Sequence, residues 1–161
     1  MFSLFKKKKT KKQLNLVSLA DGKIIDITTV SDELFSQQIL GKTIAFCFEG
    51  SSVEICSPAD GVLSVVFDTG HAFGITTNQG LELLIHIGID TVNEQGKGFT
   101  TYVHQGDSVK QGDILVAVDY DYLAKKYDTS TMLIITSSEA DNIEFIGSGN
   151  VKKGQSLLKI N

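Results

Sequence analysis

Two histidines, His71 and His86, lie fifteen residues apart in the segment HAFGITTNQGLELLIH. The residues between them read as two short strands joined by the turn-forming sequence TTNQG. If the turn is centred between Asn78 and Gln79, residues whose numbers sum to 157 face each other, and His71 lies directly opposite His86. A three-residue loop with Gly80 as a bulge would instead shift the register by one residue and turn the rings apart. The spacing favours a pair of facing imidazoles.

The alternation of side chains indicates which face this pair occupies. In LELLIHIGI the odd-numbered residues are all Leu or Ile, which is typical of a strand face that packs on a core. His86 then lies on the opposite face with Leu84, and His71 is expected to share a face with Phe67, Thr69 and Phe73. We therefore expect both rings to leave the core within an apolar surface.

Two neighbouring imidazoles suit phosphoryl transfer. A neutral imidazole is a nucleophile near neutral pH, because its ordinary pKa is about 6.5. A second imidazole beside it can donate a hydrogen bond to an anion that the first one receives. The hydroxyl of Thr69 could fix the tautomer of His71, and Gly88 leaves room beside His86 for a bulky group.

Other interpretations of the histidines stay open or fail on the sequence. For zinc binding, the sequence contains neither an HxxxD nor an HxH motif, and it offers no evident third ligand beyond Asp90. A purely structural pair does not fit a shared exposed face. His104, in YVHQGD, is interpreted as an ordinary surface histidine. The segments SPADGVLSVV and GDSVKQGDILVAV are similar to turns of biotinyl and lipoyl carrier domains, but TTNQG has no lysine to modify. No metal and no cofactor is expected.

The composition is that of one soluble β-rich unit. The chain has 161 residues, 15 glycines, one proline and many short β-branched runs, with 42% hydrophobic and 21% charged residues. No apolar run approaches the roughly 18 residues of a membrane span, and no secretory signal is evident. Cys47 and Cys56 have no metal-ligand spacing and are expected to be buried free thiols in a reducing cytosol.

Charge is unevenly distributed along the chain. Residues 1–12 hold six of the 15 basic residues, and the rest carries nine lysines against 19 acidic residues, a formal net charge of −10. Such an acidic body excludes a nucleic-acid binder. Every basic residue is lysine, which excludes a guanidinium clamp for phosphate, and no GxxxxGK[ST] loop is present. Residues 1–13 are expected to be a flexible tail, with solubilisation and weak membrane contact through residues 1–12 as its two alternatives.

The remaining pattern predicts an all-β fold, an antiparallel β-sandwich with one or two very short helices. Residues 14–30 read as two strands around ADG, and SDELFSQQILG reads as a short helix capped by Ser31. A second short helix is expected from Asp119. The segments 105–118 and 147–160 align without gaps and share V-K-x-G-x-x-L, a turn that leads into a buried strand.

The motifs SPADGVL, DTGHAFGI, LELLIHIGIDTV and GFTTYVHQGDSVKQGD resemble those of the glucose-type IIA component (EIIA) of the bacterial phosphoenolpyruvate-dependent sugar phosphotransferase system. The resemblance runs from about residue 15 to the C-terminus and implies a single domain over 14–161 with the same sandwich fold. Gly70 stands where some members carry asparagine. The family implies phosphorylation of His86 on Nε2, stabilisation of the phosphoryl group by His71, and orientation of His71 by Thr69.

The resemblance also implies partners. The phosphoryl donor would be the histidine-phosphorylated carrier protein HPr, and the acceptor a cysteine on a IIB domain of a sugar permease. Regulatory protein targets are a second expectation, because a free-standing IIA component can serve other proteins. The expected location is the cytoplasm, next to the membrane permease. The implied partner-binding rim comprises Leu34, Phe35, Leu40, Phe67, Phe73, Leu84, Asp90 and Asp141.

Overall fold

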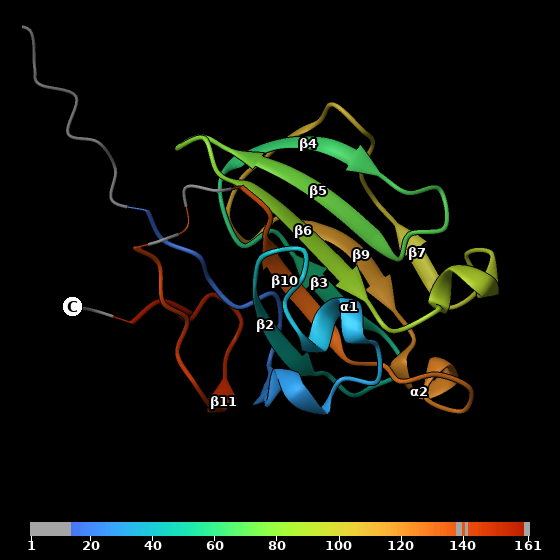
Figure 1. The fold of residues 1–161 in the computed structure, drawn as a ribbon. Coiled ribbons are helices and arrows are strands. Elements are labelled where there is room, and N and C mark those ends of the chain that lie inside the picture. Colours follow the sequence, from blue (N-terminus) through green and yellow to red (C-terminus); the bar gives the residue numbers. More distant parts are fainter. Residues whose placement is uncertain (1–13, 138–139, 141, 160–161) are drawn as a thin grey trace, which may run out of the picture.

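Two antiparallel sheets form the body of the protein (Figure 1). The computed structural model describes residues 14–137, 140 and 142–159. The large sheet has eight strands in the order β11-β1-β2-β10-β6-β5-β4-β8, and the small sheet has the order β3-β9-β7. This is the antiparallel sandwich that the strand and turn pattern predicts.

The large sheet consists of β1 (Gly22–Ile25), β2 (Lys42–Cys47), β4 (Gly61–Val66), β5 (Ala72–Thr77), β6 (Glu82–Ile87), β8 (Ser108–Val109), β10 (Thr131–Ile135) and β11 (Gly149–Val151). The small sheet consists of β3 (Val53–Cys56), β7 (Phe99–Thr101) and β9 (Ile114–Val118). The helical segments are α1 (Glu33–Ser36), α2 (Tyr120–Leu123) and the 3-10 turns η2 (Ile27–Thr29) and η3 (Thr91–Glu94). No helix in the described part of the chain is long and apolar enough to cross a membrane.

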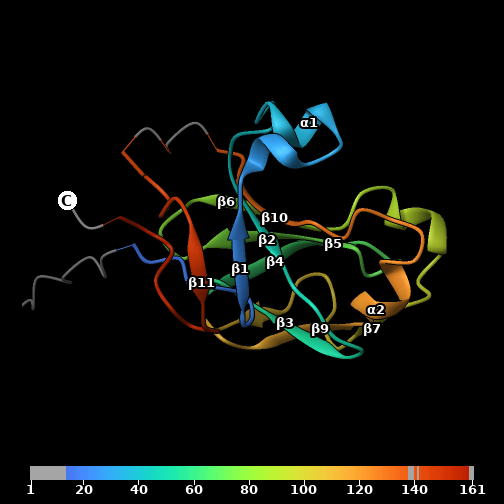
Figure 2. The same ribbon diagram turned by 90° about the horizontal axis from the view of Figure 1, so that it is seen from below.

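Two apolar cores lie on opposite faces of the large sheet. The main core fills the space between the sheets and takes Leu83, Ile85 and Ile87 from β6, as the alternation predicts. A second, smaller core lies on the outer face beneath α1 and includes Phe35 and Met132. Figure 2 shows α1 on one side of the large sheet and the small sheet on the other. Strand β10 is buried along its whole length because both of its faces are covered.

The predicted repeat between segments 105–118 and 147–160 is present as two equivalent turns. The amide of Lys110 donates to the side chain of Asp113, and that of Lys152 donates to the side chain of Gln155. Each turn follows a short strand that pairs with the glycine of an ADG sequence: Val109 with Gly61, and Val151 with Gly22. The repeat therefore builds both ends of the large sheet.

The N-terminal segment differs from the sequence prediction. Only the residues after ADG form a strand, β1, while Val17 makes an isolated bridge to Ser156. Helix α1 is capped by Asp32, whose carboxylate accepts from the amide of Leu34, and not by Ser31 as predicted. The prediction of a second helix beginning at Asp119 is confirmed by α2. Cys56 is buried and Cys47 is half-buried, and neither forms a disulfide.

Candidate functional site

The side chains of His71 and His86 meet on the outer face of the large sheet. Their ring centroids lie 5.3 Å apart and the ring planes are inclined by 84°. His86 lies in β6, and His71 immediately precedes β5, the neighbouring strand. The prediction of an imidazole pair is confirmed.

The register that joins the two strands differs by one residue from the preferred prediction. His86 pairs with Ala72, and the carbonyl of His71 accepts from the amide of Ile87. The residue numbers of facing residues therefore sum to 158 and not to 157. The loop closes from Thr77 to Leu81 and contains Gly80 at φ 89°. This is the glycine-bulge alternative. The rings still meet because His71 lies outside the strand, where strict alternation of side chains does not apply.

His71 is held from its Nδ1 side. The hydroxyl of Thr69 lies 2.5 Å from Nδ1, and the His71 side chain is almost fully buried. Burial lowers the pKa of His71 below its ordinary value. Because Nδ1 is engaged with Thr69, Nε2 is the ring nitrogen left to contact a ligand.

His86 is a neutral imidazole with one accessible nitrogen. Its Nδ1 is buried and has no hydrogen-bond partner within the described residues. The amide of Gly88, which donates to the carbonyl of Ser130, acts to raise the pKa of His86. Burial, and then the proximity of His71, lower the pKa of His86 to about 4. At neutral pH the ring is therefore unprotonated, with Nε2 as its available nucleophilic atom.

Carboxylates next to the pair give its surroundings a negative charge. Asp32 and Asp90 are both close enough to act on the pKa of His86, although their upward effect is smaller than that of burial. Asp32 caps the N-terminus of α1, and Asp90 directly precedes η3. The site therefore presents a nucleophilic nitrogen at an acidic edge, which favours a basic partner.

Aromatic rings flank each imidazole. The ring of Phe35 lies 4.7 Å from that of His86, and the ring of Phe67 lies 5.2 Å from that of His71. Phe35 is buried in the second core, whereas Phe67 is 44% exposed. Phe35 thus keeps water from one side of the His86 ring, and Phe67 extends the apolar surface outward.

The predicted rim is only partly present at this surface. Leu34 is exposed, Leu40 and Leu84 are half-buried against the second core, and Asp90 is exposed. The placement of Phe73 on this face is wrong, because Phe73 pairs with Ile85 and is fully buried in the main core. Asp141 lies outside the described residues.

One residue near this pair, Asp32, was not predicted from the sequence. Asp32 competes with Ser31 for the cap position in SDEL, and the sequence alone favoured the serine. Within the described residues, no three His, Cys, Asp or Glu side chains are grouped as metal ligands.

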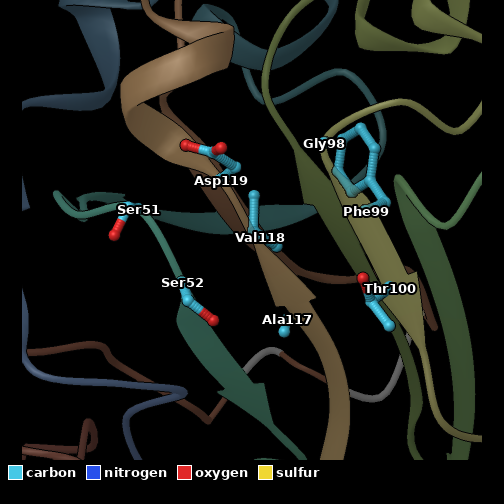
Figure 3. A pocket seen from close by; sticks show the side chains of 8 residues that line it. All are labelled: Ser51, Ser52, Gly98, Phe99, Thr100, Ala117, Val118 and Asp119. Carbon is cyan, nitrogen blue, oxygen red and sulfur yellow. The ribbon is translucent and has the colours of Figure 1, made fainter.

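A separate hollow of about 250 Å³ lies at one end of the small sheet (Figure 3). Neither histidine lines it, and its contributors come from the turn before β3, from β7 and from the end of β9. The residues are Ser51, Ser52, Gly98, Phe99, Thr100, Ala117, Val118 and Asp119. This hollow is therefore distinct from the imidazole pair.

Comparison with known proteins places the chain in a family. Residues 14–141 match the family described as phosphoenolpyruvate-dependent sugar phosphotransferase system, EIIA 1. A PTS system glucose-specific EIIA component of Borreliella burgdorferi is 37% identical over 143 residues, covering 88% of this chain and 73% of that protein. A PTS system glucose-specific EIICBA component of Streptococcus pneumoniae is 43% identical over 124 residues, covering 76% of this chain and 17% of that protein.

A solved structure agrees with the sequence comparison. Glucose permease IIA from Mycoplasma capricolum superposes with a TM-score of 0.84 at 37% sequence identity, covering 90% of this chain and 94% of that one. The chain spans only about a fifth of the EIICBA relatives, 17% of the Streptococcus pneumoniae protein and 20% of that of Staphylococcus carnosus. It belongs to the EIIA 1 family of the phosphoenolpyruvate-dependent sugar phosphotransferase system.

Proposed function

We propose that this protein is a phosphoryl carrier in which His86 accepts a phosphoryl group from phosphorylated HPr and passes it to a IIB cysteine. The observation that carries the proposal is the imidazole pair itself: an unprotonated His86 with only Nε2 accessible, and His71 beside it at 5.3 Å between ring centroids. Membership of the EIIA 1 family supports the same role.

In the first step the Nε2 lone pair of His86 attacks the phosphorus on the donor histidine. A new P–N bond forms, the old P–N bond breaks, and its electron pair returns to the donor imidazole. His71 donates a hydrogen bond from Nε2 to a phosphoryl oxygen, while Thr69 holds the tautomer that carries this proton. In the second step a IIB cysteine thiolate attacks the phosphorus, and the electron pair of the P–N bond returns to His86.

The surface around the pair suits a protein donor better than a small phosphate ester. It is apolar at Phe67 and at Leu34 of α1, and acidic at Asp32 and Asp90. The chain contains no arginine with which to neutralise a phosphate. A basic partner would bring that charge with it and would also be attracted by the acidic edge.

The relatives also suggest the acceptor. EIICBA components join the EIIA part to other permease parts in one protein, and both EIICBA relatives compared above are named glucose-specific. We infer that the chain works beside a permease of the same kind, on the cytoplasmic face of the membrane. Residues 14–161 would form the carrier domain; the tail of residues 1–13 lies outside the described residues.

The test is intact mass after incubation with phosphoenolpyruvate, enzyme I and HPr. We expect one acid-labile phosphoryl group on the wild type and none on His86→Gln. His71→Gln should still be phosphorylated but should pass the group to a IIB cysteine more slowly. Absence of phosphorylation of the folded wild type by a competent donor would overturn the proposal, and onward transfer from His71→Gln at the wild-type rate would overturn the role of His71.

A further inference from the structure

Asp128 joins two segments of the chain that are far apart in sequence. One carboxylate oxygen, Oδ1, accepts from the amide and hydroxyl of Ser130, at 2.9 and 2.6 Å. The other, Oδ2, accepts from the amide and hydroxyl of Ser31, 97 residues away, at 3.2 and 3.0 Å. Burial acts to raise the pKa of Asp128, but the hydrogen bonds from the two serines outweigh it and lower that pKa. The carboxylate is therefore ionised at neutral pH.

The bonds from Ser31 connect Asp128 to helix α1, which packs on His86. Ser31 directly precedes Asp32, the cap of α1, and α1 carries Phe35, whose ring packs on His86. Among the described residues, the side-chain hydrogen bonds that tie the η2–α1 segment to a distant part of the chain are those from Ser31 to Asp128. Asp128 therefore anchors the segment that leads into α1, while the amide of Thr43 in β2 donates to the side chain of Gln38 after the helix.

Backbone carbonyls of the same loop bind the segment that follows His86. The carbonyl of Ser130 accepts from the amide of Gly88 at 2.9 Å, and the carbonyl of Asp128 accepts from the amide of Ile89 at 2.8 Å. The loop that holds Ser31 through its carboxylate thus also holds the chain between His86 and Asp90 through its carbonyls. The loop of residues 128–130 therefore holds both the segment that leads into α1 and the backbone that follows His86.

Apolar packing by itself does not fix this arrangement. The second core presses α1 onto the sheet, but apolar contact has no preferred direction and permits sliding. Hydrogen bonds are directional and specify one position. We propose that Asp128 is a positioning residue that fastens α1 over His86 and so sets the contact of Phe35 with the His86 ring and the distance of the Asp32 charge from it. The part that concerns phosphoryl transfer rests on the function proposed above.

The consequence for His86 has a definite direction. Burial is the main cause of the low pKa of His86, and the charged or titratable groups that act on it are His71, Asp32 and Asp90. If α1 is released, water reaches the ring and the pKa of His86 rises toward 6.5, even though Asp32 moves away. A loss of general stability would not move this pKa in the folded protein.

The experiment compares hydroxyl deletions on the two sides of the same carboxylate. Ser31→Ala removes a bond that crosses to α1, whereas Ser130→Ala removes one within the loop. Asp128→Asn supplies one acceptor oxygen in place of two and can accept from the backbone amide of only one serine. The readouts are the His86 titration by NMR, without any donor, and the rate of phosphorylation by phosphorylated HPr.

We expect Asp128→Asn and Ser31→Ala to raise the pKa of His86 by roughly half a unit or more and to slow phosphorylation about three- to tenfold. Ser130→Ala should behave as the wild type in both readouts. Equal effects of the two serine variants, or no shift in either Asp128→Asn or Ser31→Ala, would overturn the inference. Should Asp128→Asn fail to fold, the two serine variants decide the matter. If the wild type is not phosphorylated, the proposed function fails, and the titration still decides whether Asp128 positions α1.

Discussion

The ring of Phe35 covers one side of the His86 imidazole, with 4.7 Å between the centroids and 45° between the planes. Phe35 is 4% exposed and belongs to the second core, so it both stabilises α1 and keeps water from the His86 ring. The low pKa of His86 and the packing of a four-residue helix therefore depend on the same side chain.

Phe35→Ala should lower the free energy of unfolding by about 3 kcal/mol, because it removes a buried aromatic side chain. It should also raise the pKa of His86 from about 4 toward 6.5. Urea unfolding and an NMR titration measure the two effects. Leu34→Ala is the matched control on the same helix, since Leu34 is 39% exposed, and it should cost less than about 1 kcal/mol. Equal effects of both variants would contradict the role given to Phe35.

Stability should depend on pH through His86. Its pKa is about 6.5 when unfolded and about 4 when folded, so the unfolded chain binds the proton more tightly. The stability is therefore fully present above pH 6.5 and is lost as the pH falls toward 4, by up to roughly 3 kcal/mol. Urea unfolding at several values of pH measures this loss.

His86→Gln provides the control for that pH dependence, because glutamine does not titrate. The variant should lose less stability between pH 6.5 and 4 than the wild type does, while the carboxylates contribute equally to both proteins. Parallel curves for the two proteins would show that His86 does not carry the effect.

The apolar alternation of β6 and the repeated turns could be predicted because their signals are local. Leu81, Leu83, Ile85 and Ile87 face the main core as predicted, and both V-K-x-G turns form. Ile89 does not continue this row: it lies beyond the end of β6 and belongs to the second core. The register of the hairpin could not be decided in this way. TTNQG is compatible with both a two- and a three-residue loop, and only tertiary contacts select the bulged form.

The packing of Phe35 on His86 could not be predicted from the sequence for a different reason. A helix as short as ELFS is unstable alone and forms only where Phe35 can pack on a sheet that other segments build. The misplacement of Phe73 has a related cause. Alternation was extended through the turn before β5, where the strand pattern does not hold, and Phe73 lies in the main core opposite Ile85.

The contact between Thr69 and His71 predicts that losing the Thr69 hydroxyl impairs phosphoryl transfer through the tautomer of His71, even where the packing of the side chain is kept. Thr69→Val preserves the shape of the side chain but removes the hydroxyl that lies 2.5 Å from Nδ1. We expect onward phosphoryl transfer to slow by roughly tenfold, with a stability loss of about 1 kcal/mol. Thr69→Ser retains the hydroxyl and should transfer near the wild-type rate. Nitrogen chemical shifts of His71 report its tautomers directly, and unchanged shifts in Thr69→Val would refute this assignment.

Gly88 tests how tightly the backbone after His86 is packed. Its φ is +76°, and an added Cβ would lie 2.4 Å from Cγ2 of Thr91, whose hydroxyl donates to the carbonyl of Ile87. Gly80 has a similar φ of +89° but nothing within 4 Å of an added Cβ. Gly80→Ala should therefore cost only the backbone strain, about 1 kcal/mol, whereas Gly88→Ala should cost about 2 kcal/mol more and shift the His86 resonances.

Both alanine variants are measured by urea unfolding, and the difference between them isolates the contact with Thr91 from the backbone strain that the two glycines share. A double variant, Gly88→Ala with Thr91→Ser, removes the Cγ2 methyl while retaining the hydroxyl that bonds to Ile87. It should recover much of the lost stability and return the His86 resonances toward their wild-type positions. If Gly88→Ala costs no more than Gly80→Ala, the backbone between His86 and Asp90 shifts to accommodate the added Cβ at little cost in stability. The backbone that follows His86 would then be less rigid than its hydrogen bonds to Asp128 and Ser130 imply.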